Sequence, residues 1–342
     1  MQSRRTLVHL LVLAASLLLA AARTQAPQPQ APAGERRWFR GNTHTHTVNS
    51  DGDSAPDAVV RWYREHGYQF VVITDHDMIT PVEGLNALFA APEKFLIVAG
   101  EEVSDRFSGT PVHLNAIAPR EVVKVQGGAT LLETVARNAR AIRSAGGVVQ
   151  INHPNFGWAL NAEALAAATD AKLFELANAH PLVNNHGGGG SPSTEEIWDA
   201  VLSTGRVLYA AASDDTHHLQ CRATGECVPP GKAWIMVRAR QLTAEALVAA
   251  LEAGDFYATT GVRLASYEAD ARGIRIALPE NTSRSAPRYR TLFIGKGGAV
   301  LKTDTSMQPA CEFRGDELYV RARVESSDGS TAWTQPVFPI KK

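Results

Sequence analysis

Cysteine and net charge are both scarce in this chain of 342 residues. It contains three cysteines, and its 34 Lys and Arg against 35 Asp and Glu give a formal net charge of −1. No basic run stands out, so the chain lacks the positive patch that binds the phosphate backbone of nucleic acids. We therefore expect a small-molecule substrate and no nucleic-acid partner.

Long apolar runs are missing except at the N-terminus. Arg4 and Arg5 precede an apolar run from Leu7 to Ala22, and the small residues that follow allow cleavage after Ala22 or Ala26. This order predicts a secretory signal peptide over residues 1–26 and an exported, periplasmic or secreted protein. The run is shorter than the roughly 20 residues of a membrane span, so we expect no stable span after cleavage; a retained anchor is the alternative.

The few cysteines are unevenly spaced. Cys221 and Cys227 flank a short polar loop, and Cys311 is left over. In an exported protein the first two could form a disulfide, and two unpaired loop thiols are the alternative. A structural zinc site is disfavoured there because no second Cys/His pair has matching spacing.

Changes in composition divide the chain into segments. Residues 27–37 are rich in Pro and Gln at their start and predict a linker. Residues 38–265 alternate seven apolar, strand-like runs with helical patterns, which predicts a parallel, barrel-like α/β domain. From 266 to 342 shorter alternating runs separated by turns predict a small antiparallel β module.

Polar residues of the metal-ligand type recur after the apolar runs of the larger domain. His44 and His46 are two apart, so a strand would place both imidazoles on one face, where they could bind one ion. Alone, this pair also fits a solvated strand. Four later apolar runs lead into further ligand-type residues, namely Asp75-His76-Asp77, Glu101-Glu102, His153 and Asp214-Asp215-Thr216-His217. Such ligands after buried strands predict an active site at one edge of an α/β barrel.

In their order along the chain these motifs resemble the polymerase and histidinol phosphatase (PHP) family of metallo-hydrolases. The resemblance covers residues 38–265 and rests on His44-x-His46, Asp75-His76, Glu102, His113, Asn152-His153-Pro154 and Asp215-x-His217. It implies a distorted seven-stranded (βα) barrel that carries two or three divalent metal ions at its C-terminal face. Within the family, the chain resembles an exported branch similar to the carbamate-hydrolase-like PHP proteins.

The resemblance also implies a role for each ligand. One ion is held by His44, His46 and Asp215. Glu102 bridges it to a second ion, held also by His113 and His153. Asp51, His76 and His217 hold a third, although Asp51 stands where many relatives have His. The family patterns Gly-x-Glu-x-Ser and Asp-x-His select Glu102 over Glu101 and Asp215 over Asp214.

The ligand chemistry agrees with this assignment. Imidazole and carboxylate ligands suit Zn, Mn or Fe, and the sequence does not choose among them. Two ions about 3.5–4 Å apart lower the pKa of a shared water, which gives a bridging hydroxide as nucleophile. Asp75 and Asp77 flank His76 and are predicted to orient it or to accept protons. His180 follows the apolar run Leu173–Leu176 and is predicted to contact the substrate.

Three functions fit these observations. The first is an exported metal-dependent phosphoesterase acting on a small phosphate ester, with Arg106 and Lys124 as candidate phosphate ligands by position alone. The second is an amide, carbamate or ester hydrolase with the same metal centre. The third is a metal-stabilised cell-surface binding module with the β module as adaptor. The signal peptide argues against polymerase proofreading and histidinol-phosphate hydrolysis, which are cytoplasmic.

Overall fold

The computed structural model of the protein describes residues 35–221, 227–280, 283 and 286–340. Residues 35–342 form one compact unit, which is the subject of the following description. The predicted signal peptide and most of the predicted linker lie outside the described residues. Among the described residues, none of the helices combines the length and apolar character that crossing a membrane requires.

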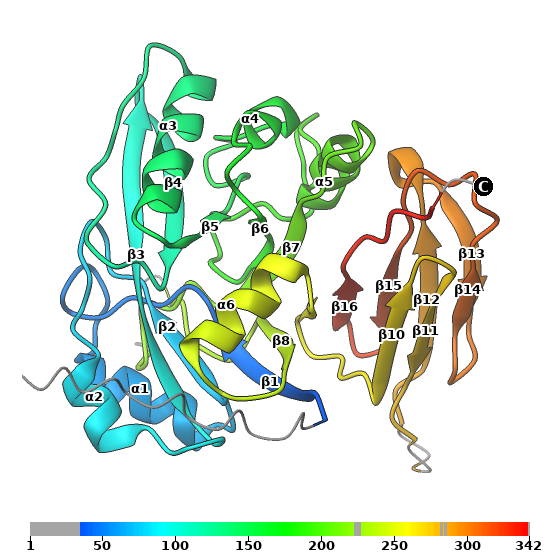
Figure 1. The fold of residues 1–342 in the computed structure, drawn as a ribbon, viewed down its shortest axis with the longest axis horizontal. Helices are drawn as coiled ribbons and strands as arrows, with labels where there is room; N and C mark the ends of the chain where they lie inside the picture. The colour runs from blue at the N-terminus through cyan, green and yellow to red at the C-terminus, as the bar shows by residue number, and fades with distance from the viewer. Residues whose placement is uncertain (1–34, 222–226, 281–282, 284–285, 341–342) are drawn as a thin grey trace, which may run out of the picture. The chain divides into compact units, whose positions relative to one another are not determined.

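Strands and helices are mixed up to residue 260, where only β3–β4 and β7–β8 follow each other without a described helix between them, and strands dominate from there on (Figure 1). The helices are α1 (Pro56–Glu65), α2 (Glu83–Phe89), α3 (Leu131–Ser144), α4 (Ala162–Ala167), α5 (Thr194–Leu202), α6 (Ala244–Ala253) and the 3₁₀ turn η1 (Lys296–Gly298). The strands up to residue 260 are β1 (Arg37–Asn42), β2 (Phe70–Ile73), β3 (Leu96–Phe107), β4 (Thr110–Ile117), β5 (Val148–Ile151), β6 (Leu173–Asn178), β7 (Tyr209–Ser213), β8 (Trp234–Ala239) and β9 (Phe256–Thr259). The later strands are β10 (Ser266–Asp270), β11 (Gly273–Ala277), β12 (Tyr289–Ile294), β13 (Val300–Asp304), β14 (Ala310–Glu312), β15 (Arg321–Ser326) and β16 (Thr331–Thr334).

The main sheet is mixed and open rather than a closed barrel. It has 13 strands in the order β13-β12-β15-β16-β9-β8-β1-β2-β3-β4-β5-β6-β7. Its two parallel stretches, β1-β2-β3 and β5-β6-β7, are separated by the antiparallel strand β4, and β8 runs antiparallel to β1. The α/β class is therefore confirmed, whereas the seven-stranded barrel is not.

The two distant ends of the β1–β7 stretch nevertheless meet at one point. A parallel bridge joins Thr45 to Thr216, and the amide of His46 donates to the carbonyl of Thr216 at 2.9 Å. Elsewhere along β7 the side chain of Gln335 takes the place of a neighbouring strand, because its amide bonds both the N–H and the C=O of Ala210, at 2.8 and 2.9 Å. The segments after β1 and β7 thus lie side by side, which brings their histidines together.

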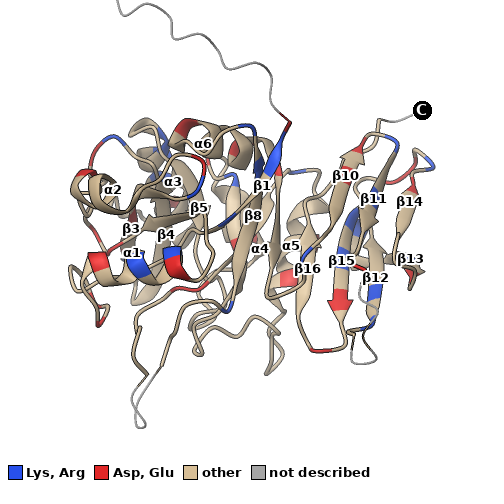
Figure 2. Ribbon diagram, turned by 90° about the horizontal axis from the view of Figure 1, so that it is seen from below, with Lys and Arg blue, Asp and Glu red and all other residues tan. Residues whose placement is uncertain are grey.

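The C-terminal strands form two groups. β12, β13, β15 and β16 extend the main sheet through the antiparallel pairing of β16 with β9, so the sheet continues across the predicted boundary at residue 265. β10, β11 and β14 form a separate antiparallel sheet of three strands. Lys and Arg are interspersed with Asp and Glu over both groups and over the α/β part, in keeping with the balanced charge (Figure 2).

Local sequence signals explain where the helices begin and what they bury. Pro56 starts α1, whose residues Val59 and Tyr63 are buried. Ser193 caps α5 and exchanges hydrogen bonds with Glu196, which confirms the predicted capping box. In the core beneath α3, α4 and α5, apolar side chains of these helices pack against β3 to β7.

Candidate metal centre

The predicted ligands reach one edge of the sheet from strands of both directions. His44, His46 and His76 follow β1 and β2, as expected from parallel strands. Glu102 lies within β3 rather than after it, because β3 continues to Phe107. His113 lies near the start of β4, opposite Ser104 of β3, because β4 runs back along β3. The missed signal is Ser108-Gly109, a two-residue hairpin turn in which both residues have positive φ (50° and 86°).

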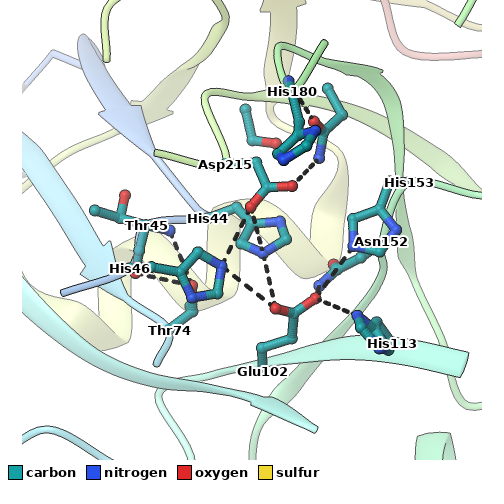
Figure 3. A network of polar contacts seen from close by, with 12 residues as sticks. His44, Thr45, His46, Thr74, Glu102, His113, Asn152, His153, His180 and Asp215 are labelled. Atoms are coloured by element: carbon teal, nitrogen blue, oxygen red, sulfur yellow. Dashed lines mark hydrogen bonds and ion pairs between the residues drawn. The ribbon is translucent and has the colours of Figure 1, made fainter. Parts of the chain in front are cut away.

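All nine predicted ligands come together in the structure, and several of them are seen in Figure 3. They fall into overlapping groups whose ligand atoms lie within 4.8 Å of one another: His46, Asp51, His76 and His217; His44, His46 and Glu102; His44, His153 and Asp215; and His76, Glu102 and His113. Clusters of buried imidazoles and carboxylates of this density are typical of transition-metal sites.

Glu102 lies at the centre of the cluster and is buried. Its Oε2 is 3.3 Å from Nε2 of His44 and 3.3 Å from Nε2 of His46. Its Oε1 is 3.2 Å from Nδ1 of His113 and 3.2 Å from Nε2 of His153. The two oxygens of one carboxylate therefore face two different pairs of histidines, which is the arrangement that a bridging ligand requires.

Three atoms around Glu102 are buried and make no hydrogen bond, namely Nε2 of His44, Nε2 of His46 and Oδ1 of Asp215. Oδ1 of Asp215 lies 3.3 and 3.2 Å from the two imidazole nitrogens. Ligand atoms around a tetrahedral ion with bonds of about 2.0 Å lie about 3.3 Å apart. Because buried polar atoms are otherwise almost always paired, these atoms fit a shared divalent cation.

The third predicted group is more open to solvent. Asp51 is 53% exposed, and its oxygens lie 3.3 Å from Nε2 of His76 and 3.5 Å from Nε2 of His217. Nδ1 of His46 is also 3.5 Å from Asp51, so His46 belongs to this group as well as to the first. Gly52 lets the loop approach this closely, since a Cβ there would lie 2.8 Å from the backbone of His46.

The structure separates each ambiguous carboxylate pair. Glu101 points to the opposite face of β3 from Glu102 and accepts the amide of Val123 at 2.8 Å. Asp214 accepts the amides of three consecutive residues, 231–233, at 2.7 to 2.9 Å. Glu102 and Asp215, the residues that the family patterns select, are the ones in the cluster.

A second layer of polar residues holds the ligands, and of these the sequence had pointed only to Asn152, as part of a motif. Glu175 of β6 is fully buried and lies 2.7 Å from Nδ1 of His44, so Nε2 of His44 faces the cluster. The carboxylate of Glu175 also accepts a hydrogen bond from the backbone amide of His153 at 2.7 Å. The amides of Asn152 and Asn178 donate to Glu102 at 2.8 Å and to Asp215 at 3.0 Å. The sequence did contain one signal for Glu175, because a charged residue is unusual inside an otherwise apolar strand such as Leu-Phe-Glu-Leu.

The three residues predicted to be catalytic lie in different surroundings. Asp75 is buried and accepts hydrogen bonds from Thr47 and Ser50, so it holds the loop that carries Asp51. Asp77 lines the open cleft and accepts the amide of Ser104 at 2.9 Å. His180 also lines the cleft, with its ring 5.5 Å from that of His217. The cleft thus contains Asp77 and His180 but not Asp75.

Opposite charges dominate the electrostatics of the cluster. Burial disfavours the ionised carboxylate of Glu102, but the imidazoles of His44 and His113 outweigh burial and hold its pKa well below the usual value. Burial likewise disfavours the imidazolium of His217, but Asp51 and Asp215 raise its pKa to about 9. A metal ion that binds His217 must therefore displace its proton.

Three of the seven described non-glycine residues with positive φ lie at the site. Asp77, His153 and Asp215 have φ values of 54°, 23° and 50°, in the left-handed region that non-glycine residues rarely adopt. Such conformations persist where the surrounding contacts hold them, and they gather at functional sites.

A cleft of about 600 Å³ opens onto the cluster. Besides the ligands it is lined by Arg106, Phe156 and Leu182, together with Asp77 and His180. Arg106 is exposed, and no described carboxylate pairs with it. Lys124, the other candidate phosphate ligand, lines a separate cavity beside α3.

Comparisons with known proteins bear on this fold. No family model and no curated protein matches the chain. A two-domain protein from Bacteroides vulgatus, described as containing a predicted PHP-like metal-dependent phosphoesterase, matches with a TM-score of 0.50 and 15% identity, over 90% of this chain and 98% of that one.

The chain has a PHP-like fold. The likeness to the Bacteroides protein supports the resemblance to the PHP family, and it extends over the C-terminal strands as well. A candidate metal-dependent phosphoesterase from Bifidobacterium adolescentis has a TM-score of 0.39 and 18% identity, over 56% of this chain and 91% of that one. An amidohydrolase from Chromobacterium violaceum, solved with sulfate and no metal, has a TM-score of 0.35 and 16% identity, over 55% and 93%. The narrower resemblance to an exported carbamate-hydrolase branch finds no support here.

Proposed function

We propose that this protein is a metal-dependent phosphoesterase that hydrolyses a small phosphate ester. The observation that carries the proposal is the set of three buried ligand atoms that make no hydrogen bond, from His44, His46 and Asp215, gathered beside the carboxylate of Glu102. A PHP-like fold with this cluster fits a hydrolase that uses divalent ions.

The chain's own residues supply ion binding, orientation and proton transfer. His44, His46, Glu102 and Asp215 would hold one ion, and Glu102 with His113 and His153 a second. Bound divalent ions would lower the pKa of a water and offset the charge of the phosphoryl group. Arg106, at the mouth of the cleft, presents a planar guanidinium that matches two phosphate oxygens.

We propose that His180, which lines the cleft, contacts the leaving group of the substrate. Its Nδ1 accepts the backbone amide of Leu182 at 3.2 Å, which holds the ring in place. A proton donor at this position would assist departure of an alkoxide, which is a poor leaving group without a proton. Asp77, which also lines the cleft, is the candidate proton acceptor.

The test combines metal analysis with a substrate panel. Purified protein is stripped of metal, and its turnover of phosphomonoesters, phosphodiesters and aryl carbamates is measured with Zn, Mn or Fe added back. We expect metal-dependent hydrolysis of a phosphoester. Cleavage of carbamates alone would favour the amide, carbamate or ester hydrolase, and no turnover by metal-loaded protein would favour a binding module.

We further propose that the protein is exported. The order of Arg4, Arg5 and the apolar run from Leu7 to Ala22 supports this. The closeness of Cys221 and Cys227, whose Cα atoms lie 5.2 Å apart, is compatible with it, because disulfides persist in oxidising compartments. N-terminal sequencing of protein from the native host should begin near Arg23 or Pro27. An intact Met1 on the mature protein would contradict export.

A further inference from the structure

A second cavity of about 880 Å³ lies next to the metal cleft of about 600 Å³. His180 lines both, so a molecule bound at the metal centre can extend past this side chain into the second cavity. The cavity is lined by the segment after β6, the start of α5, the segment before β8, and the strands β15 and β16. The C-terminal strands thus contribute to a space that continues the active site.

One face of the β15–β16 pair forms the wall of this cavity. Arg323 of β15 pairs with Trp333 of β16, and Glu325 pairs with Thr331. All four line the cavity, whereas Val324, which lies between Arg323 and Glu325 in β15, is buried on the opposite face. This is the alternation expected of a strand pair with one face in the core and one face toward a ligand.

The charges on this wall cancel. The guanidinium of Arg323 lies 3.0 Å from an oxygen of Glu195 and 2.8 Å from an oxygen of Glu325. Lys232, which is exposed at the cavity, has no ion-pair partner among the described residues, and its amide is fixed by Asp214 at 2.7 Å. The wall therefore offers many hydrogen-bonding groups but only a small net charge.

We infer that this cavity binds a sugar-like, polyhydroxylated ring that is the leaving group of the phosphate ester. The partly exposed indole of Trp333 suits the apolar face of such a ring. Arg323 and Glu325 pair with each other and with Glu195 and Arg290, and they line the cavity, where their remaining N–H groups and lone pairs can bond hydroxyls. The inference rests on the proposed phosphoesterase, since it names the substrate class of that same site.

The first experiment measures binding without turnover. Neutral monosaccharides and inositol, none of which carries a phosphate, are titrated into the metal-loaded protein, and binding is followed by ligand-observed NMR. We expect at least one to bind, and Trp333→Ala to weaken it about tenfold or more. Trp333→Phe should retain most of the affinity. Trp158→Ala, which removes an exposed tryptophan outside the cavity, should change nothing.

The second experiment compares two substrates. Trp333→Ala and Glu325→Gln should lower kcat/KM for a sugar phosphate about tenfold while leaving phenyl phosphate unchanged, because phenyl phosphate does not fill the cavity. Glu325→Gln also serves if Trp333→Ala fails to fold.

The inference is overturned if no neutral polyol binds, if only anionic sugars bind, or if both substrates lose rate equally. A protein that binds sugars but hydrolyses no phosphoester would refute the proposed function and leave the sugar site standing.

Discussion

Two buried polar clusters of this protein differ in how many of their polar atoms have a hydrogen-bond partner within the cluster. The guanidinium of Arg321 donates to both oxygens of Asp199, at 2.8 and 2.6 Å, and to Glu195 at 2.7 Å. Each of its three nitrogens thus has an anionic partner. Around Glu102, by contrast, Nε2 of His44 and Nε2 of His46 are buried without a hydrogen bond.

The difference separates structural from functional charge. A closed ion-pair cluster such as that of Arg321 needs no ligand, and here it fastens β15 to α5. An open cluster leaves desolvated atoms unpaired, which is unfavourable unless a cation completes it. Burial alone would not distinguish the two, whereas the unpartnered atoms do.

The largest effect is expected from removing the centre of the open cluster. Glu102→Ala removes a ligand from both candidate ion sites and leaves the repulsion between the two bound cations unscreened. Turnover should therefore fall about a thousandfold or more. Metal content should fall with it, as measured by elemental analysis.

Glu101→Ala is the matched control, because this side chain lies one residue away on the other face and bonds Val123. It should keep its metals and most of its turnover. Asp51→Ala, at the exposed third group, should lose at most one ion and less activity. A dead, metal-poor Glu101→Ala beside an active Glu102→Ala would contradict the assignment of the bridge.

The closed cluster should respond through stability rather than metal content. Arg321→Met leaves Asp199 buried without its partner, and the free energy of unfolding should fall by about 3–5 kcal/mol. Chemical denaturation measures this change. Adding Asp199→Asn removes the uncompensated charge, so the double variant should lose less than Arg321→Met alone. If metal content of the folded protein falls instead, the two clusters are not independent.

A smaller effect is expected from the residue that orients His44. Glu175→Gln keeps the shape of the side chain but removes the charge that lies 2.7 Å from Nδ1 of His44, so metal affinity should fall about 10–100-fold. Competition with a chromogenic chelator measures it. Glu163→Gln, on the exposed side of α4, is the control and should retain full affinity.

The sequence predicted the members of the open cluster better than the sheet that carries them. His44, Glu102 and Asp215 were identifiable because each lies in a short local motif with fixed spacing. Glu175 has no such motif, since its partner His44 lies 131 residues away in the chain. Only the fold reveals that pairing.

Strand direction was the weaker part of the prediction. The pattern of ligands after apolar runs implies parallel strands, whereas β4 returns along β3 through the turn at Ser108-Gly109. The open sheet follows from that hairpin and from the C-terminal strands added beyond β9. Their pairing depends on long-range contacts such as that of Trp333 in β16 with Ala258 in β9, which no local pattern encodes.

The smallest expected effect concerns how the free energy of unfolding changes at acidic pH. Burial disfavours the ionised carboxylate of Glu195, but Arg321 and Arg323 outweigh burial and lower its pKa. A carboxylate whose pKa is lower in the folded state stabilises the fold above its unfolded pKa of about 4.3, and this contribution is lost as the pH falls through the folded value.

Glu195→Gln removes this contribution and retains the size of the side chain. At pH 7 the variant should be less stable by about 1–2 kcal/mol, because charge-assisted hydrogen bonds to two arginines become neutral ones. Between pH 5 and 3 the stability difference between wild type and variant should shrink, because protonation of Glu195 makes the two alike. Urea denaturation at closely spaced pH values measures the difference. A gap that stays constant down to pH 3 would show that Glu195 acts through packing rather than through its charge.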